Sequence, residues 1–218
     1  AGRLQIDQSM MEEMVRIREA CSPDEVLLVV DSMIGQEAAE LTRAFHEQVG
    51  ITGAVLTKLE EAGCTLEHDG VGLTIKADQI NAVDLRTQPF PGFPTDLQAP
   101  FMSLLATAQG TSVITENIFE NRLQHVAELQ RMGAAIRMQG NTAFVEGVSR
   151  LSGAPVQGTD LRASAAMVLA GLAAEGITSV RGLEFLDRGY ANLEGKLNAA
   201  GACIERVNAP GGSASIAA

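Results

Sequence analysis

Two aspartates and three arginines lie at matching edges of similar segments in the second part of this sequence. Asp96 and Asp160 each stand just before a segment with helical periodicity. Arg122 and Arg188 are separated by almost the same interval as these aspartates, and Arg162 closely follows Asp160. Arginines near helix N-termini can hold carboxylate and phosphate groups through charge-assisted hydrogen bonds. The matched spacing predicts that these side chains meet at one face and bind an anion that carries both groups.

A purely structural role is the alternative for the two aspartates. An aspartate before a helix caps the free backbone N–H groups and interacts favourably with the helix dipole. That explanation is sufficient for a single aspartate, whereas the matched arginines favour a binding site. Both interpretations stay open on the sequence alone.

An internal repeat must position these residues. Gly110 and Gly176 lie in similar segments, and the interval between them is close to that between Gly133 and Gly201, which lie in another similar pair. Each copy alternates helical stretches with short β-branched runs between glycine-rich turns, which predicts the order strand, helix, strand, helix, strand, strand. The sequence therefore predicts an α/β fold built from repeated βαβαββ units.

The boundaries of the copies follow from the same spacing. Full copies are predicted at residues 80–147 and 148–207, after a truncated copy at 59–79 in which Gly63 precedes Gly133 by a similar interval. Helices are expected near residues 97–109, 123–132, 163–175 and 190–200. Residues 208–218 are rich in glycine, serine and alanine, so a flexible tail is expected there.

Residues 1–58 carry a different pattern. Methionines and other apolar residues between positions 10 and 17 have helical spacing, and Ser22-Pro23 should end that helix. Short apolar runs at 26–30 and 54–57 predict two parallel strands joined by a helix. Residues 25–57 should therefore form one β-α-β unit.

Composition limits the functions that the chain could have. The chain has 218 residues, 46% of them hydrophobic and 20% charged, which is typical of a globular protein. A net charge of −11 argues against general binding to nucleic acid or anionic membranes. The scattered cysteines (Cys21, Cys64, Cys203) suit a reducing cytoplasm, and the absence of an apolar spanning run agrees with it. The histidines (His46, His68, His125) have no metal-ligand spacing and are interpreted as surface or capping residues, so no metal or cofactor is expected.

Three segments near the N-terminus resemble a signal-recognition-particle GTPase. They are AGRLQID (1–7), PDEVLLVVDSMIGQEA (23–38) and ITGAVLTKL (51–59). The resemblance implies that Thr57 and Lys58 are a remnant of the guanine-reading Thr-Lys-x-Asp motif, in which Glu60 here replaces the aspartate. The sequence contains no GxxxxGK[ST] loop to hold phosphates. Residues 1–58 are therefore expected to be a structural αβαβ segment without GTP binding.

Four segments in the second part are very similar to enolpyruvyl transferases that act on UDP-N-acetylglucosamine. They are FPTDLQAPF (93–101), TENIFENRLQHVAEL (115–129), GTDLRASAAMVLAGLAAEG (158–176) and LDRGYANLEGKLNAAGACIERV (186–207). The resemblance implies the inverse α/β domain of that family, built from three repeats. It also implies transfer of the enolpyruvyl group of phosphoenolpyruvate to a sugar hydroxyl in peptidoglycan precursor synthesis.

The same resemblance assigns roles to individual residues. Asp96 would be the base that faces the sugar hydroxyl, and Asp160 would lie beside the reacting carbon. The sugar nucleotide would contact Thr95, Asp96, Ile118 and Phe119. Phosphoenolpyruvate would be held by Arg122, Arg162 and Arg188. The lysine and the reactive cysteine loop of the family's other domain have no match here, so weak binding of phosphoenolpyruvate or phosphate, weak or no binding of the sugar nucleotide, and no turnover are expected.

Three functional hypotheses follow. The first is the C-terminal half of an enolpyruvyl transferase, inactive alone. The second is a structural, engineered or artefactual chimera joined at Lys58-Leu59, whose polar residues only cap helices. The third is a GTPase-related module with a broken nucleotide site. No nucleic-acid or membrane partner is expected, and the oligomeric state is open.

Overall fold

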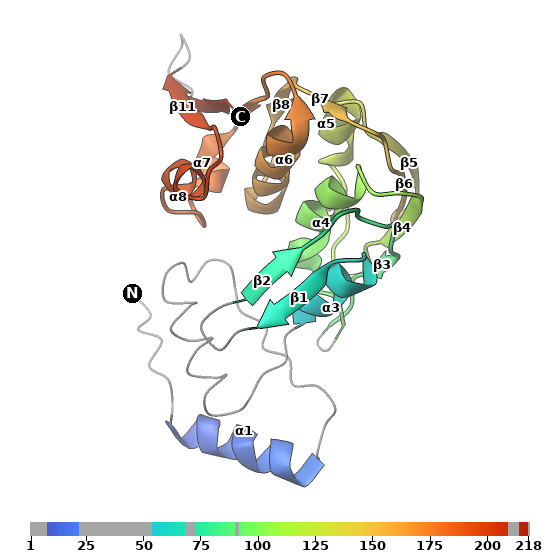
Figure 1. The fold of residues 1–218 in the computed structure, drawn as a ribbon, viewed down its shortest axis with the longest axis vertical. Coiled ribbons are helices and arrows are strands. Elements are labelled where there is room, and N and C mark those ends of the chain that lie inside the picture. The colour runs from blue at the N-terminus through green and yellow to red at the C-terminus, as the bar shows by residue number, and fades with distance from the viewer. Residues whose placement is uncertain (1–7, 22–53, 69–72, 90–91, 209–213, 218) are drawn as a thin grey trace. The chain divides into compact units, whose positions relative to one another are not determined.

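The computed structural model describes residues 8–21, 54–68, 73–89, 92–208 and 214–217 (Figure 1). The chain divides into two compact units, Ala1–Thr57 and Lys58–Ala218. Among the described residues no helix is long and apolar enough to cross a membrane.

The described part of the first unit consists mainly of helix α1, Gln8–Cys21. This helix agrees with the periodicity of the sequence and ends just before Ser22-Pro23. The first strand and the helix of the expected β-α-β unit lie outside the described residues.

The expected strand at 54–57 is wrong, because helix α3 spans Ala54–Glu61. A short apolar run fits a strand and a buried helix equally well by periodicity. The residues that follow it are good helix formers, and Lys58 pairs with Glu61 one turn later. The helix therefore extends through the point where the sequence suggested a change from strand to helical turn.

The second unit contains three successive copies of one arrangement. After α3, the truncated copy consists of the antiparallel strands β1 (Thr65–His68) and β2 (Leu73–Lys76). The first full copy comprises β3 (Leu85–Arg86), the 3-10 helix η2 (Thr95–Leu97), α4 (Gln98–Leu105), β4 (Thr111–Thr115), α5 (Val126–Arg131), β5 (Ala135–Gln139) and β6 (Thr142–Glu146). The second comprises β7 (Leu151–Ser152), β8 (Pro155–Gln157), α6 (Leu161–Ala173), β9 (Ala174–Glu175), β10 (Ser179–Arg181), α7 (Leu183–Leu186), α8 (Leu193–Ala199), β11 (Glu205–Asn208) and β12 (Ala214–Ala217).

The two full copies build sheets of the same topology. The first sheet has the order β3-β4-β6-β5 and the second has the order β8-β10-β12-β11. In each sheet the first two strands are parallel, and the remaining neighbours are antiparallel. This correspondence agrees with the repeat that the glycine spacing predicts.

Equivalent glycines end a helix in all three copies. Gly63, Gly133 and Gly201 have φ of +94°, +89° and +97°, a conformation that a residue with a Cβ rarely adopts. In each case the N–H of the next residue bonds to the carbonyl five positions back, which closes a Schellman turn. The truncated copy therefore keeps the second half of the repeat, from its second helix to its final hairpin.

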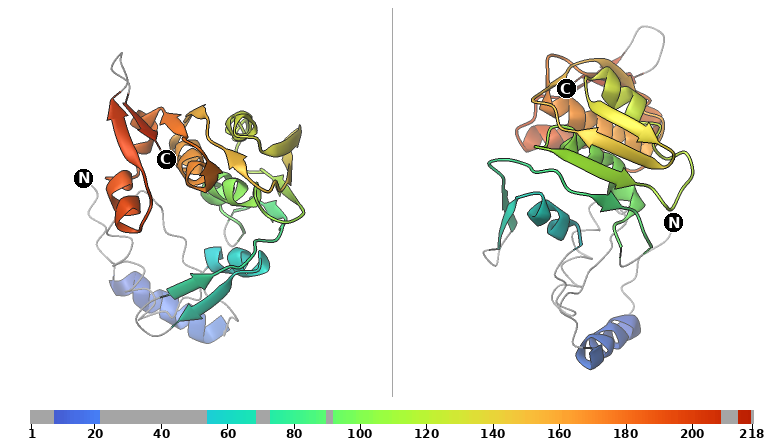
Figure 2. Two further views of the ribbon diagram at one scale, coloured as in Figure 1. Left: turned by 45° about the horizontal axis from the view of Figure 1, so that its top comes forward. Right: turned by 90° about the vertical axis from the view of Figure 1, so that its right-hand side faces the viewer.

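The core of the second unit forms where the central helices of the full copies meet. Helix α4 packs on α6, and each helix also packs on the sheet of its own copy (Figure 2). The Ser103 hydroxyl donates to the Ala166 carbonyl at 2.9 Å, so the two helices approach closely. Met102, Leu105 and Met167 are fully buried along this contact.

The expected flexible tail is wrong over residues 214–217. This segment forms β12, which lies between β10 and β11 in the second sheet. Small residues are typical of flexible tails, and the composition of this segment resembled one. The segment instead pairs with β10 on one side and β11 on the other, so its structure is set by strands that are distant in sequence.

Candidate functional site

Asp96 is held by two arginines that are distant in sequence. It lies in η2, and its Oδ1 accepts hydrogen bonds from Arg162 Nε at 2.7 Å and Arg122 Nη2 at 3.2 Å. Arg122 Nη1 also donates to the Thr95 hydroxyl at 3.1 Å. The Asp96 side chain remains 42% exposed, so the carboxylate is accessible from outside. We call Thr95, Asp96, Arg122 and Arg162 the arginine corner.

Asp160 fixes the backbone that carries Arg162. It is the N-cap of α6, and its side chain accepts from the backbone N–H groups of Arg162 and Ala163 at 2.7 and 3.1 Å. Asp160 therefore makes the contacts of a helix cap, as the capping interpretation predicts. Because the capped turn carries Arg162, the cap also sets the position from which that guanidinium reaches Asp96.

Arg188 lies on a different segment, between α7 and α8. Its guanidinium lies over the Phe185 ring at 5.5 Å, and among the described residues it makes no ion pair with Asp96 or Asp160. The next residue, Gly189, approaches the first turn of α6 so closely that a Cβ there would lie 2.7 Å from Leu161 Cδ1. The Arg188 segment thus abuts the α6 terminus beside the arginine corner, and a shared site with Arg188 stays a prediction.

Glu116 anchors this region and was missed from the sequence. The residue is 2% exposed, and its carboxylate accepts from the hydroxyls of Thr87 and Thr95 at 2.9 and 2.8 Å. It also accepts from the backbone N–H groups of Ile118 and Phe119 at 2.8 and 3.1 Å. A signal was available, because Ser112 and Ile114 are the buried positions of β4 and Glu116 continues their alternation of two.

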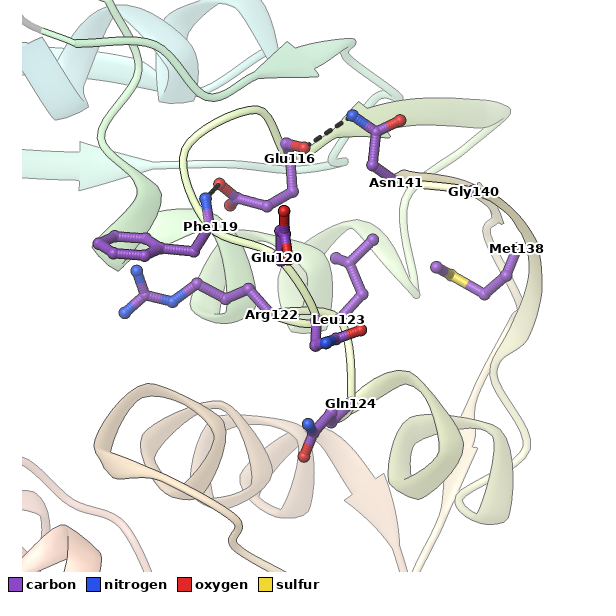
Figure 3. Close-up of a pocket in the computed structure, with 10 residues that line it drawn as sticks. Glu116, Phe119, Glu120, Arg122, Leu123, Gln124, Met138, Gly140 and Asn141 are labelled. Atoms are coloured by element: carbon purple, nitrogen blue, oxygen red, sulfur yellow. Dashed lines mark hydrogen bonds between the residues drawn. The ribbon is translucent and has the colours of Figure 1, made fainter.

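A cavity of about 480 Å³ lies beside the arginine corner (Figure 3). Its lining includes the predicted residues Phe119 and Arg122 but not Ile118 or Thr95. Phe119 is 55% exposed, and the Arg122 guanidinium lies over its ring at 4.5 Å. Figure 3 shows these two side chains on one side of the loop and Met138 and Asn141 across from it. The cavity can therefore combine an apolar surface with a cation.

His125 is buried, which corrects its interpretation as a surface or capping residue. It is 2% exposed and precedes α5 without a side-chain cap contact. Burial lowers the pKa of His125 to about 4, although the Asp160 charge and a hydrogen bond to the Arg122 backbone oppose that shift. Its Nε2 has no hydrogen-bond partner among the described residues. The buried ring therefore lies close to Arg122 and Asp160.

Thr57 and Lys58 lie within α3 rather than in a loop that follows a strand. Lys58 pairs with Glu61, one turn further along the helix. Their local geometry differs from the strand-to-loop setting that the GTPase resemblance implied.

Residues 38–197 match the family described as EPSP synthase (3-phosphoshikimate 1-carboxyvinyltransferase). The chain belongs to this family. The solved enolpyruvyl transferase NikO from Streptomyces tendae superposes with a TM-score of 0.64 at 26% identity, covering 92% of this chain and 44% of that one. The EPSP synthase family fold therefore accounts for the repeated α/β architecture.

Two curated relatives carry the description UDP-N-acetylglucosamine 1-carboxyvinyltransferase. The protein from Synechococcus sp. (strain CC9605) is 67% identical over 153 residues, which are 70% of this chain and 35% of the relative. The protein from Myxococcus xanthus (strain DK1622) is 49% identical over 214 residues, which are 96% of this chain and 50% of the relative. The chain thus spans from about a third to a half of the length of these EPSP synthase family members.

These matches give no support to a GTPase segment or to a chimera. The EPSP synthase family match begins at residue 38, upstream of the expected start at residue 59. The alignment with the Myxococcus protein extends over most of the segment 1–58 as well.

Proposed function

We propose that this chain is the C-terminal half of a UDP-N-acetylglucosamine 1-carboxyvinyltransferase. The observation that carries the proposal is the arginine corner, in which Asp96 Oδ1 lies between Arg122 and Arg162. Two guanidiniums around one accessible carboxylate can bind an anionic substrate and keep the carboxylate oriented. The descriptions of the relatives at 67% and 49% identity support the choice of reaction.

Asp96 is the base for the sugar hydroxyl in this proposal, and Asp160 lies near the reacting carbon. The guanidiniums of Arg122 and Arg162, together with that of Arg188, take the phosphate and carboxylate of phosphoenolpyruvate. The exposed ring of Phe119, with Thr95 and Ile118, contacts the sugar nucleotide. Glu116 supports this side, because it holds the Thr95 hydroxyl and the backbone N–H groups of residues 118 and 119.

The half-site should bind weakly and should not turn over alone. Residues that enclose the substrate and exclude water supply several kcal/mol of transition-state stabilisation in enzymes of this kind, roughly 10³-fold in rate or more. The chain spans half or less of the length of these relatives, and the proposal places the enclosing surface in the part that the chain does not match.

A nuclear magnetic resonance titration tests the proposal. Phosphoenolpyruvate, inorganic phosphate and UDP-N-acetylglucosamine are added separately to the ¹⁵N-labelled chain. Millimolar phosphoenolpyruvate should shift the signals of residues 95–97 and 160–163, and Arg162→Ala should abolish the shifts. Arg150→Ala, which removes a surface ion pair with Glu175, is the matched control and should leave them unchanged. Equal shifts in the wild type and Arg162→Ala would refute the proposal.

The resemblance of residues 1–58 to a signal-recognition-particle GTPase stays a prediction, as does a chimeric origin. A GDP titration of the same ¹⁵N-labelled chain tests whether residues 1–58 bind a guanine nucleotide. No signal should shift with GDP at micromolar concentration, because the sequence contains no phosphate-holding loop. Saturable GDP binding would favour a GTPase-related module.

A further inference from the structure

One arginine outside the candidate site contacts both ends of the segment that carries Arg188. Arg206 lies on β11, and its two terminal nitrogens donate to the two carboxylate oxygens of Asp187 at 3.1 and 2.7 Å. Its Nε donates to Glu194 Oε1 at 2.9 Å, and Nη2 also reaches Glu194 Oε2 at 3.4 Å. The guanidinium therefore bridges the end of α7 and the first turn of α8.

The two acidic partners bracket the Arg188 segment in sequence. Asp187 is the C-cap of α7, and Glu194 lies in the first turn of α8. Arg188 and the turn that follows it lie between these two anchors. Figure 1 shows α7, α8 and β11 gathered in the same part of the second unit. The Arg206 side chain thus links the two ends of the segment 187–194.

The contacts of Arg206 are stronger than those of an ordinary surface ion pair. An isolated exposed pair contributes little, because both side chains lose freedom and water screens the attraction. Arg206 instead makes a two-pronged contact to Asp187 and a second contact to Glu194, and its side chain is only 31% exposed. These bonds raise the pKa of Arg206, and the hydrogen bond from Arg206 lowers the pKa of Glu194. Both shifts indicate that each charged group is stabilised by its hydrogen-bonded partner, against the opposing effect of burial.

The opposite side of the segment is held by packing. Gly189 lies against the Leu161 side chain, where a Cβ would come within 2.7 Å of Cδ1. Leu161 directly follows the Asp160 cap and precedes Arg162 of the arginine corner. The Arg188 segment is therefore fixed between Arg206 on one side and the first turn of α6 on the other.

The first full copy needs no such anchor. Arg122, the repeat equivalent of Arg188, is held directly by Asp96 and Thr95. The position that the glycine spacing makes equivalent to Arg206 is occupied by a methionine, Met138. Arg188 has no equivalent contact with Asp96 among the described residues, so its position depends on the segment that carries it.

We propose that Arg206 is a positioning residue that holds Arg188 in place to bind the anionic group of the substrate. The inference rests on the proposed function, because it assumes that Arg188 contacts the substrate. Arg206 itself lies on β11 and acts only through Asp187 and Glu194.

A double-substitution experiment on phosphate binding tests this role. Inorganic phosphate is titrated into the full chain and into Arg188→Ala, Arg206→Ala and the double variant. Arg206→Ala should weaken phosphate binding by about fivefold, a typical coupling between neighbouring groups. The double variant should bind no more weakly than Arg188→Ala, because Arg206 acts through Arg188. Arg150→Ala, which breaks a more exposed ion pair, should bind as the wild type does.

Hydrogen exchange separates this inference from the proposed function. The amides of residues 188–193 should exchange at least several-fold faster in Arg206→Ala, while the amides of α6 stay unchanged. The variant with both Asp187→Asn and Glu194→Gln should show the same faster exchange in residues 188–193. It replaces Arg206→Ala in the experiment if that variant fails to fold. Additive losses of phosphate affinity, or unchanged exchange in both variants, would overturn the inference. Absent phosphate binding in the wild type would refute the proposed function, and exchange alone would then decide whether Arg206 anchors the segment.

Discussion

At the residue scale, His125 shows how a buried neutral group makes stability depend on pH. Its ring lies beside Arg122 and Asp160, and desolvation lowers its pKa to about 4. The unfolded chain binds a proton at this histidine below a pH of about 6.5, whereas the folded chain does not bind one until a pH of about 4. Folding stability should therefore fall as the pH drops through this window.

The prediction is a difference between the wild type and His125→Asn. Between pH 6.5 and 4 the free energy of unfolding of the wild type should fall more steeply, by at most about 1.4 kcal/mol per pH unit. Urea unfolding at a series of pH values measures it. Parallel curves for the two proteins would show that His125 does not contribute.

Glu116 gives a second prediction at this scale. Glu116→Gln replaces one acceptor oxygen by a donor, while two hydroxyls and two backbone N–H groups still require acceptors. The free energy of unfolding should fall by about 1–3 kcal/mol, the cost of a buried polar group without its partner. Glu146→Gln, at an exposed position of β6, is the control and should change stability by less than about 0.5 kcal/mol. A Glu116→Gln protein as stable as this control would contradict the anchoring role.

At the scale of elements, the repeat turns are defined by glycine conformation. Gly133 and Gly201 have φ of +89° and +97°, yet a Cβ added at either position would meet no atom within 4 Å. Substitution by alanine should therefore cost only backbone strain, about 1 kcal/mol at each site.

Gly147→Ala provides the contrasting case. A Cβ there would lie 1.5 Å from the Ala108 carbonyl oxygen, which belongs to the backbone and cannot rotate away. The loss should exceed that of Gly133→Ala by at least about 1 kcal/mol in denaturant unfolding. Equal losses at positions 133 and 147 would show that the chain there relaxes freely.

At the scale of the second unit, the last strand completes a sheet. A chain that ends at Asn208 lacks β12, so β10 and β11 lose the strand between them. Several backbone hydrogen bonds disappear, and at about 1 kcal/mol each the free energy of unfolding should fall by at least about 2 kcal/mol. Removal of Ala218 alone is the control. Identical urea midpoints for the two shortened chains would restore the interpretation of this segment as a flexible tail.

The sequence by itself determined the repeat and its local signals. Periodicity predicted the central helices, and the two sheets share one strand order, although the second sheet includes β12 beyond the predicted end of its copy at residue 207. The aspartate cap at residue 160 was also predictable, because it acts on N–H groups two and three residues away. Such features depend on hydrogen bonds within a few residues, which neighbouring side chains specify.

Tertiary structure alone decided the contacts between distant segments. The repeat spacing predicted that Asp96 and Arg162 share one face, but only the tertiary structure shows that Arg162 Nε donates to Asp96 Oδ1. Glu116 accepts from the hydroxyls of Thr87 and Thr95, which come from other segments. His125 and β12 were misjudged for the same reason, since the environment of each is set by elements packed on it rather than by its neighbours in sequence. Burial and sheet pairing depend on the packed unit, so a local pattern suggests them only where it continues a regular alternation, as at Glu116.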